Sequence, residues 1–499
     1  MREKRGDTMI KKAIGFILVA AMLCTSFVSF AAEDEGEYIT LEETSFTDAG
    51  SLEDVSNQFG ISEATYVAFR NALISTVTQF KASMNIYSYG IPYTSDSINA
   101  LSLLLSSGNA LTFNLNVGST GFTVSGGKLN TLKFTYSMTA DEYNTYIGEC
   151  DRAVDRLVSD FENDENLSDL QKALLVHDRI AVHCEYDADV DTKNIPWTDS
   201  CMYGALVLKE CVCEGYAEAY SYILDRLGIE NYLCSSYQLS HIWNIITVDG
   251  ARYHVDVTHD DKVYDVSGKV YHDNFLASTE ALKAGGSHSA DDYDTSPSDT
   301  TYDDAFWKNV YASFDYLKGT VYYIDRETQS LCSWDGVNSV PLESVAGLWR
   351  YQSWGNQARL QAYGDYLFYS LPDGIYLFDV RNCRSEQIFA PDLSAYSNFA
   401  VYGFKIEDDK IYCDVYSSYA FSATAKADYE IVTDLVINTM TGDVDGDGGI
   451  TVKDSKLLMK YLLGLCEDRE IVFRNSDTDA DSCISTKDTK NLTRLLLEG

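Results

Sequence analysis

The sequence predicts a multidomain protein of the α+β class. Its 499 residues are too many for one hydrophobic core, since single cores stop growing at roughly 250–300 residues. Helical periodicity and alternating strand-like segments are mixed over the first 300 residues, whereas residues 305–438 are strand-like throughout. The last sixty residues contain an internal repeat, which indicates a further small domain.

The composition is that of a globular protein, with 45% apolar residues and a formal net charge of −38. Such an acidic surface repels phosphate groups and anionic lipid, so neither nucleic acid nor a membrane surface is an expected partner. Of the 12 cysteines, 11 remain if a leader containing Cys24 is removed. An odd number at irregular spacing does not predict a disulfide framework, and a reducing habitat would keep the thiols free.

Residues 1–31 predict a signal peptide. Two lysines precede an apolar run over residues 13–23, and Ser29 and Ala31 suit a small-x-small cleavage site. The apolar run is too short to span a bilayer. We therefore expect a secreted, extracellular protein; a lipid anchor at Cys24 is the less favoured alternative, because a leucine precedes that cysteine.

Residues 32–140 predict an N-terminal α+β region, with a helix over 63–81 and strands over 111–117 and 132–138. Apolar residues at three- and four-residue intervals then predict helices over 140–161 and 168–183, the second with Ser168 as N-cap.

The next domain is expected to cover residues 141–285. The polar, turn-rich stretch 286–304 is expected to be a linker. Similar strands recur about every 45 residues within 305–438, at 321, 367 and 411. This period is typical of propeller blades, although three blades do not close a propeller; a partial propeller and a β-sandwich are both open.

A duplicated pattern fills residues 440–499, as "DVDGDGGITVKD" from 443 and "DTDADSCISTKD" from 477. Acidic residues fall at positions one, three, five and twelve of each copy, the spacing with which a tight loop surrounds Ca²⁺. Position seven offers a backbone carbonyl, and position nine is Thr or Ser. The predicted ligands of two Ca²⁺ ions are Asp443, Asp445, Asp447, Gly449, Thr451 and Asp454, and Asp477, Asp479, Asp481, Cys483, Ser485 and Asp488.

This repeat of loop followed by helix, with Asp at position twelve, resembles a type I dockerin domain over residues 442–499. The resemblance implies calcium-dependent binding to a cohesin module of a scaffolding protein, typically in a cellulosome. The helices expected at 452–463 and 486–497 would carry that interface. An indirect association with plant cell-wall polysaccharide is also implied.

The stretch "KECVCEGYAEAYSYILDRLG" at 209–228 predicts a helix that starts at Cys213 and ends at Gly228. A thiolate at a helix N-terminus is stabilised by free N–H groups and by the helix dipole. Cys211 lies two residues earlier, without that benefit. Cys213 is therefore the candidate nucleophile, against the alternative that it is a small core residue.

The stretch "HIWNIITVDGARYHVDVTHDD" at 241–261 predicts two strands joined by an Asp-Gly turn. Closing on that turn pairs residues whose numbers add to 499, so that Trp243 faces Asp256 and His241 faces Thr258. His241 and Asp256 then become diagonal neighbours, roughly 7–8 Å apart at the backbone. The imidazole would be the base for the thiol and the carboxylate its orienter. Residues with competing claims to these roles are His254, His259, Asp260 and Asp261.

A metal site at Cys211 and Cys213 is disfavoured, because no second ligand pair has zinc spacing.

Four segments resemble the transglutaminase-like superfamily in order and spacing: "HDRIAVHCEYD" (177–187), "SCMYGALVLKECVCEGYAEAY" (200–220), "HIWN" (241–244) and "YHVDVTHDD" (253–261). The resemblance implies a papain/transglutaminase-like core with Cys213 as nucleophile, His241 as base and Asp256 as the third member of the triad.

Two residues depart from the pattern of that superfamily: Cys211 replaces a usual glycine or small residue, and His259 replaces a usual tryptophan. The glutamine that papain-like enzymes carry six residues before the nucleophile is also absent. The backbone N–H of Cys213, with Trp197 or Tyr203, is the expected oxyanion donor.

The expected function is that of a secreted, cellulosome-associated cysteine peptidase or amidase that acts on protein amides. Acyl transfer to an amine would make it a cross-linking enzyme instead. A non-catalytic cellulosome component is one alternative. A polysaccharide-degrading accessory protein is another, although no glycosidase carboxylate pair can be identified among 76 acidic residues.

Overall fold

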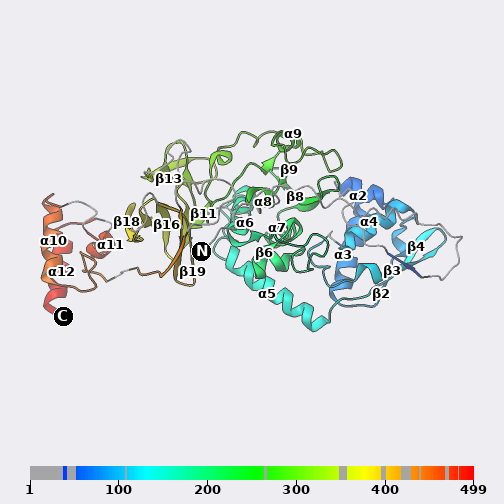
Figure 1. Ribbon diagram of the computed structural model, residues 1–499, viewed down its shortest axis with the longest axis horizontal. Helices are drawn as coiled ribbons and strands as arrows, with labels where there is room; N and C mark the ends of the chain where they lie inside the picture. The colour runs from blue at the N-terminus through cyan, green and yellow to red at the C-terminus, as the bar shows by residue number, and fades with distance from the viewer. Residues whose placement is uncertain are drawn as a thin grey trace, which may run out of the picture. The chain divides into compact units, whose positions relative to one another are not determined.

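The computed structural model describes residues 38–41, 52–106, 109–262, 267–347, 357–394, 400–416, 429–437, 440–466, 471–481 and 483–498. The expected signal peptide lies outside these residues. The chain forms two compact units: the first comprises Met1–Glu162, Arg179–Asp260 and Asp273–Ala305, and the second Asn163–Asp178, Asp261–His272 and Phe306–Gly499. Separate antiparallel sheets and helices make the protein a multidomain α+β chain, as predicted (Figure 1).

The N-terminal part of the first unit combines three helices with a small antiparallel sheet of strand order β1-β3-β4-β2. Its hydrophobic core includes Phe59, Phe69, Leu101 and Phe122. The elements are β1 (Ile39–Thr40), α2 (Leu52–Gln58), α3 (Glu63–Thr78), β2 (Ser83–Asn85), α4 (Ser95–Ser106), β3 (Gly121–Ser125) and β4 (Lys128–Lys133).

The strand predicted at 111–117 is wrong, because that stretch forms turns and contributes only one bridge, from Leu115 to Tyr136. The strand predicted at 132–138 ends at Lys133. The hairpin instead closes on Gly126 and Gly127, whose φ angles of 56° and 71° suit a tight turn between twisted strands.

Two long helices open the central part: α5 (Ala140–Val158) and α6 (Asp169–His183). Thr139 caps α5 in a capping box with Glu142. Ser168 caps α6, as predicted, since its Oγ accepts the backbone N–H of Gln171 at 3.2 Å.

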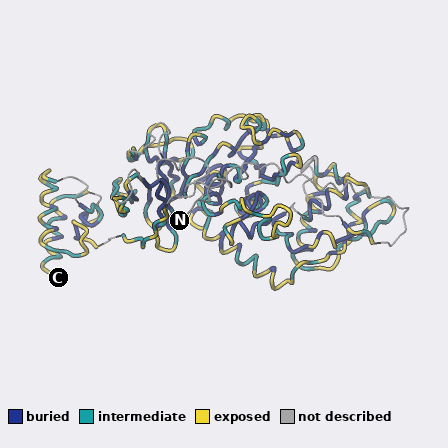
Figure 2. The backbone as a smooth tube through the Cα atoms, in the orientation of Figure 1, coloured by how far each residue is buried: buried dark blue, intermediate teal, exposed yellow. Residues whose placement is uncertain are grey.

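A sheet of order β10-β9-β8-β7 carries helix α7 (Cys213–Leu227), which packs on β7 (Asn231–Ser236) and β8 (His241–Val248) (Figure 1). Strand β8 is buried along almost its whole length (Figure 2). The remaining elements of this part are β5 (Glu185–Tyr186), a π-helical turn (Gly204–Leu208), β6 (Glu210–Cys211), β9 (Ala251–Val255), α8 (Val257–Asp260), β10 (Phe275–Ala277) and α9 (Thr279–Ala284).

The predicted register of the β8–β9 hairpin is confirmed, since Asn244 pairs with Val255 and Val248 with Ala251. The predicted pairing of His241 with Thr258 does not form. Strand β9 ends at Val255, and the chain turns into the short helix α8.

Residues 286–304 contain no helix or strand, but they are not a solvated linker. His288 is fully buried. The hydroxyls of Tyr232 and Tyr253 donate to Asp294 (2.6 Å) and Asp299 (2.7 Å), and Ser236 bonds to Asp292. These carboxylates hold the segment against strands β7 and β9, so the central part extends beyond the predicted boundary at residue 285.

The second unit contains three consecutive sheets, each of which follows the order of the chain. The recurring segments of the sequence are the second strand of each sheet: β12 (Thr320–Asp325), β16 (Tyr366–Leu371) and β20 (Lys410–Tyr416). This meander connectivity is that expected of propeller blades rather than of a Greek-key sandwich. The other strands are β11 (Asp315–Leu317), β13 (Ser330–Trp334), β14 (Ser339–Ser344), β15 (Leu360–Tyr363), β17 (Gly374–Asp379), β18 (Arg384–Phe389), β19 (Ala400–Glu407) and β21 (Tyr429–Asp434).

The C-terminal tail is a pair of loop–helix units. Helices α10 (Val452–Leu462) and α12 (Thr486–Glu498) pack together, and α11 (Phe473–Ser476) lies between them in the chain. Their small core includes Val444, Leu458 and Leu492. Within the described ranges, no helix has the length and apolar character needed to cross a membrane.

Candidate active site

Cys213 is the first residue of α7, as predicted. It belongs to a small apolar cluster with Ala217 and Ile242, against which Leu233 packs, and only 8% of the residue is exposed. The backbone N–H groups of Ile242 and Glu214 act to lower the pKa of its thiol. Strand β8 therefore brings the peptide group that follows His241 directly to the thiol.

Cys211 is a packing residue. It is fully buried, and its Sγ lies 3.5 Å from the Sγ of Cys184. A Cβ atom at Gly215 would lie 2.7 Å from the Cys211 sulfur, so only glycine fits at this position in the first turn of α7. The described part of the chain holds 11 cysteines, none of them in a disulfide.

His241 and Asp256 meet, as the hairpin argument expects. Nε2 of His241 lies 2.7 Å from Oδ2 of Asp256, which is completely buried. Oδ1 of the same carboxylate accepts the backbone N–H of His259 at 3.1 Å. The carboxylate is thus fixed by the first turn of α8 while it orients the imidazole.

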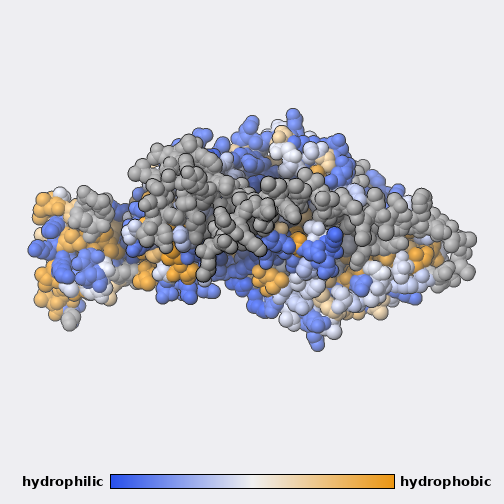
Figure 3. All heavy atoms as spheres, in the orientation of Figure 1, coloured by the Kyte–Doolittle hydropathy of each residue, from blue (hydrophilic) through white to orange (hydrophobic). Residues whose placement is uncertain are grey.

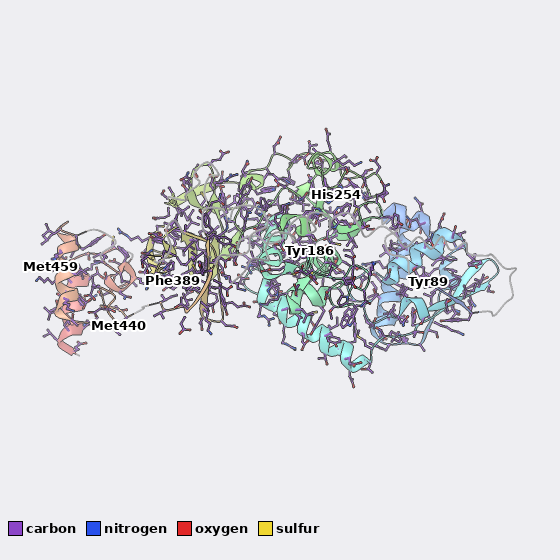
Figure 4. All side chains as sticks on the ribbon, in the orientation of Figure 1. Tyr89, Tyr186, His254, Phe389, Met440 and Met459 are labelled. Atoms are coloured by element: carbon purple, nitrogen blue, oxygen red, sulfur yellow. The ribbon has the colours of Figure 1, made fainter. Side chains whose placement is uncertain are left out.

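Two further imidazoles reach the same carboxylate oxygen: Nδ1 of His259 at 2.6 Å and Nε2 of His288 at 2.8 Å. The sequence placed His259 near the site, but it gave no signal for His288, which was assigned to a linker. His254, which is labelled in Figure 4, has other partners: it accepts the indole N–H of Trp243 at 3.1 Å and lies 2.9 Å from the hydroxyl of Thr279.

Asp260 and Asp261 do not join the triad contacts. Asp260 accepts the side-chain amide of Asn274 at 2.9 Å, and Asp261 is a buried residue of the second unit.

The two expected oxyanion partners are engaged elsewhere. The hydroxyl of Tyr203 donates to Glu149 at 2.8 Å. The ring of Trp197 stacks on Phe113 at 5.7 Å between centroids. A residue that sequence reasoning missed is Tyr186 on β5 (Figure 4), which lies within the electrostatic influence of Cys213. Its signal was present in the motif at 177–187.

Burial dominates the electrostatics of the site. It raises the pKa of the Cys213 thiol to about 12, although the N–H of Ile242 acts in the opposite direction. Burial lowers the pKa of His241 to about 4, against the opposing effect of Asp256. Burial also raises the pKa of Asp256, but His241 and His259 outweigh this and hold it well below its ordinary value. The resting site is therefore a neutral thiol, a neutral imidazole and a carboxylate, not the helix-stabilised thiolate that the sequence predicts.

No hydrogen bond joins the sulfur of Cys213 to the ring of His241 among the described residues. Because Nε2 of His241 faces Asp256, the nitrogen left for the thiol is Nδ1. With the Cys213 thiol and the His241 imidazole both neutral at rest, the imidazole would take the proton only as the sulfur attacks. The hydrogen bond between them need not exist beforehand, because catalytic hydrogen bonds often tighten only when substrate is bound.

A cavity of about 190 Å³ borders this region. Leu233 and Ile242, which contact Cys213, line it, together with Tyr66 and Leu104 of the N-terminal helices. The N-terminal part thus supplies a wall of the space beside the nucleophile.

Glu214 gives the site a pH-dependent stability. Burial raises the pKa of its carboxyl to about 8. A raised pKa stabilises the fold fully below the unfolded value near 4.5, and this stability is lost as pH rises through about 8. As pH rises from 5.5 to 8.5, the parent should lose about 2 kcal/mol of unfolding free energy relative to Glu214→Gln. The full conversion is ~1.4 kcal/mol per pKa unit, and the expected loss is smaller because water reaches part of the carboxyl.

Urea unfolding of both chains at the two pH values measures the difference. Glu230→Gln, which alters an exposed carboxylate, is the control. Parallel pH dependences of the parent and Glu214→Gln would contradict the burial argument.

The tail loops hold their carboxylates in matching positions. Oδ1 of Asp454 accepts the N–H of Val444 at 2.6 Å, and Oδ1 of Asp488 accepts that of Thr478 at 2.7 Å. The other carboxylate oxygen, Oδ2, accepts the N–H of Thr451 in Asp454 and the N–H of Ser485 in Asp488.

The possible ligand atoms of Asp443, Asp445 and Asp454, and of Asp477, Asp479 and Asp488, form two groups within 4.8 Å. At position five, Asp447 pairs with Lys453 (3.5 Å) and Asp481 with Lys487 (3.2 Å).

These loops fit Ca²⁺ by their donor chemistry. Burial raises the pKa of Asp445, and the charges of neighbouring carboxylates add to the effect. Clustered carboxylates of this kind are the ligands that Ca²⁺ prefers. The remaining predicted ligands, Gly449 and Cys483, donate their N–H groups to Asp447 (3.2 Å) and Asp481 (3.1 Å), so the two loops match at position seven as well.

Comparison with known proteins adds little. No protein-family model matches the chain, and no curated protein does either. Among solved structures, the chain is similar to one described as "Crystal structure of a TGase", with 14% identity and a TM-score of 0.20. The similarity covers 29% of this chain and 45% of that one, less than half of its length. A transglutaminase is thus among the structures that part of this chain resembles.

Proposed function

We propose that the central part of the first unit is a cysteine acyl-transfer enzyme with Cys213 as nucleophile, His241 as base and Asp256 as orienter. One observation carries the proposal. A single strand, β8, places Ile242 in the small apolar cluster that contains Cys213 and, one residue earlier, an imidazole held at 2.7 Å by a buried carboxylate. Nucleophile, base and orienter are the parts that covalent acyl transfer requires.

The first half of the reaction makes a thioester. Nδ1 of His241 takes the thiol proton while the sulfur of Cys213 bonds to the amide carbonyl carbon, and the carbonyl electrons move to the oxygen. Asp256 stabilises the resulting imidazolium. As the oxyanion collapses, the C–N bond breaks, and the imidazolium returns its proton to the leaving amine. The N–H at Cys213 is positioned to bind the oxyanion.

In the second half, water attacks the thioester carbon, and its proton passes to His241. The C–S bond breaks, and Cys213 regains a proton. An amine in place of water would form a cross-link. We favour hydrolysis of peptide or side-chain amides; casein cleavage compared with incorporation of a dansylated amine separates the two outcomes.

We infer that the tail is a calcium-dependent docking domain of the dockerin type, with a cohesin module as its partner, in an extracellular cellulosome-like complex. The acidic loops support calcium binding. Large apolar side chains on the tail helices and the turn that follows α10 support a protein partner, since exposed apolar surface favours association. Figure 3 shows apolar side chains gathered on the tail; the most exposed are Val452, Met459, Leu463, Leu465 and Leu497.

The full chain should bind two Ca²⁺ ions in equilibrium dialysis, and EDTA should remove both. Asp454→Ala and Asp488→Ala should each remove one ion, because position twelve closes the coordination shell. Asp392→Ala, which alters an exposed carboxylate, is the control and should leave both. EDTA should also abolish capture of the chain by immobilised cohesin while Cys213 stays reactive; binding of no Ca²⁺, or capture that survives EDTA, would contradict the docking proposal.

A further inference from the structure

Four side chains that can ligate a metal converge at the proposed active site, although the triad uses only two of them, His241 and Asp256. The ligand atoms of His241, Asp256, His259 and His288 all lie within 4.8 Å of one another. Nδ1 of His259 lies 3.0 Å from Nε2 of His241, and both reach the same oxygen of Asp256. Three of the seven histidines of the chain are thus collected around one buried carboxylate.

Hydrogen bonding alone does not account for this arrangement. One carboxylate oxygen has two lone pairs, yet three imidazole nitrogens approach Oδ2 of Asp256, at 2.6, 2.7 and 2.8 Å. The adjacent nitrogens of His241 and His259 would bring two N–H groups together if both donated. Oγ of Ser287 lies 2.9 Å from Nδ1 of His288, so the other nitrogen of that ring also has a hydrogen-bonding partner that orients it.

We propose that His241, His259, His288 and Asp256 form a binding site for a divalent transition metal ion such as Zn²⁺, and that the bound ion switches off the triad. Three imidazoles and one carboxylate form a ligand set that zinc accepts. Tetrahedral zinc sites have ligands about 2.0–2.2 Å from the metal, hence about 3.3 Å apart. The present nitrogens and oxygen need to move outward by about half an ångström to reach that geometry.

The switch follows from the tautomer of His241. A metal on Nε2 takes the lone pair of that nitrogen, so the single proton of the neutral ring resides on Nδ1. Nδ1 is the nitrogen left for Cys213, and once protonated it cannot accept the thiol proton. Asp256 meanwhile ligates the metal instead of stabilising an imidazolium. The ion thus blocks the base while the sulfur stays in place.

This site is a property of this chain rather than of the triad. His259 is not a member of the proposed triad, yet its Nδ1 lies 2.6 Å from Oδ2 of Asp256. His288 lies in the segment 286–304, which follows α9 in the chain, and it is fully buried. The metal site does not depend on the proposed acyl transfer, whereas the inhibition does rest on it.

The test is a titration of the full chain with Co²⁺ in saturating Ca²⁺, which keeps the oxygen-rich tail loops filled. We expect one equivalent of Co²⁺ to produce the visible absorption of a four-coordinate ion, and Zn²⁺ to displace it. His259→Trp and His288→Ala should each weaken binding by at least the ~10–100-fold that loss of a supporting partner costs in metal sites. His183→Gln, at the end of α6, is the control and should bind as the parent does.

Two further measurements leave all four proposed metal ligands in place. Zn²⁺ should slow carbethoxylation of His259 in the parent but not of His183, as mapped by mass spectrometry. Cys213→Ala should leave the Co²⁺ spectrum unchanged, because the sulfur is not a ligand. The proposal would be overturned if the parent showed no stoichiometric Co²⁺ absorption. It would also be overturned if His259→Trp and His288→Ala both bound Co²⁺ as tightly as the parent. A chain that binds Co²⁺ but cleaves nothing would overturn only the proposed enzyme activity.

Discussion

Replacing Cys213 by alanine should lower the casein-hydrolysing activity of the chain by at least about 10³-fold. The reason is that the sulfur forms the covalent intermediate, and water at the same place would lack both its nucleophilicity and its position beside Ile242. The initial rate of peptide release from labelled casein, compared between parent and variant at equal concentration, measures the effect.

Cys211→Ala is the matched control, since this thiol lies two residues away and packs against Cys184. It should keep most of the activity. Iodoacetamide mapping provides a second measurement: among the buried thiols, Cys213 should react before Cys234 and Cys332, since His241 is its proposed base. Equal inactivity of parent and Cys213→Ala toward casein and amine donors would instead favour a non-catalytic role.

Asp256→Asn should cost about 10⁴-fold in kcat/KM, the loss seen when a triad carboxylate becomes an amide. The amide cannot stabilise an imidazolium, and its NH₂ group would face nitrogens that now point at Oδ2. The variant should also lose about 3 kcal/mol of unfolding free energy, because several buried polar groups lose their acceptor.

Asp260→Asn separates the two effects. Asp260 is equally buried and accepts hydrogen bonds from Asn274, so its loss should lower stability without a comparable loss of kcat/KM. Urea unfolding and initial rates on the same preparations give both quantities. An Asp256→Asn variant with stability lowered but rate unchanged would show that the carboxylate is only structural.

Local signals in the sequence predicted the elements that carry the triad. An Asp-Gly turn and two alternating strands gave the correct register of β8 and β9, because the turn type fixes the pairing. The helix start at Cys213 and its end at Gly228 followed from apolar periodicity and a left-handed glycine. These features depend on neighbours in the chain.

Features set by tertiary packing were not predictable in this way. The neutral state of the thiol results from burial against Ile242 and Leu233, which lie on other elements. His288 reaches Asp256 from a segment without periodicity, so no pattern marked it. The strand expected at 111–117 failed because alternation alone does not supply a pairing partner.

The carboxylate-rich segment after α9 determines where the chain can be divided. A fragment that stops at residue 285 would end after the last helix of this part, yet it would leave Tyr232, Tyr253 and Ser236 without their acceptors. It would also remove the imidazole of His288 from beside Asp256. The smallest autonomous version of the part that carries Cys213, His241 and Asp256 therefore has to retain residues up to 305.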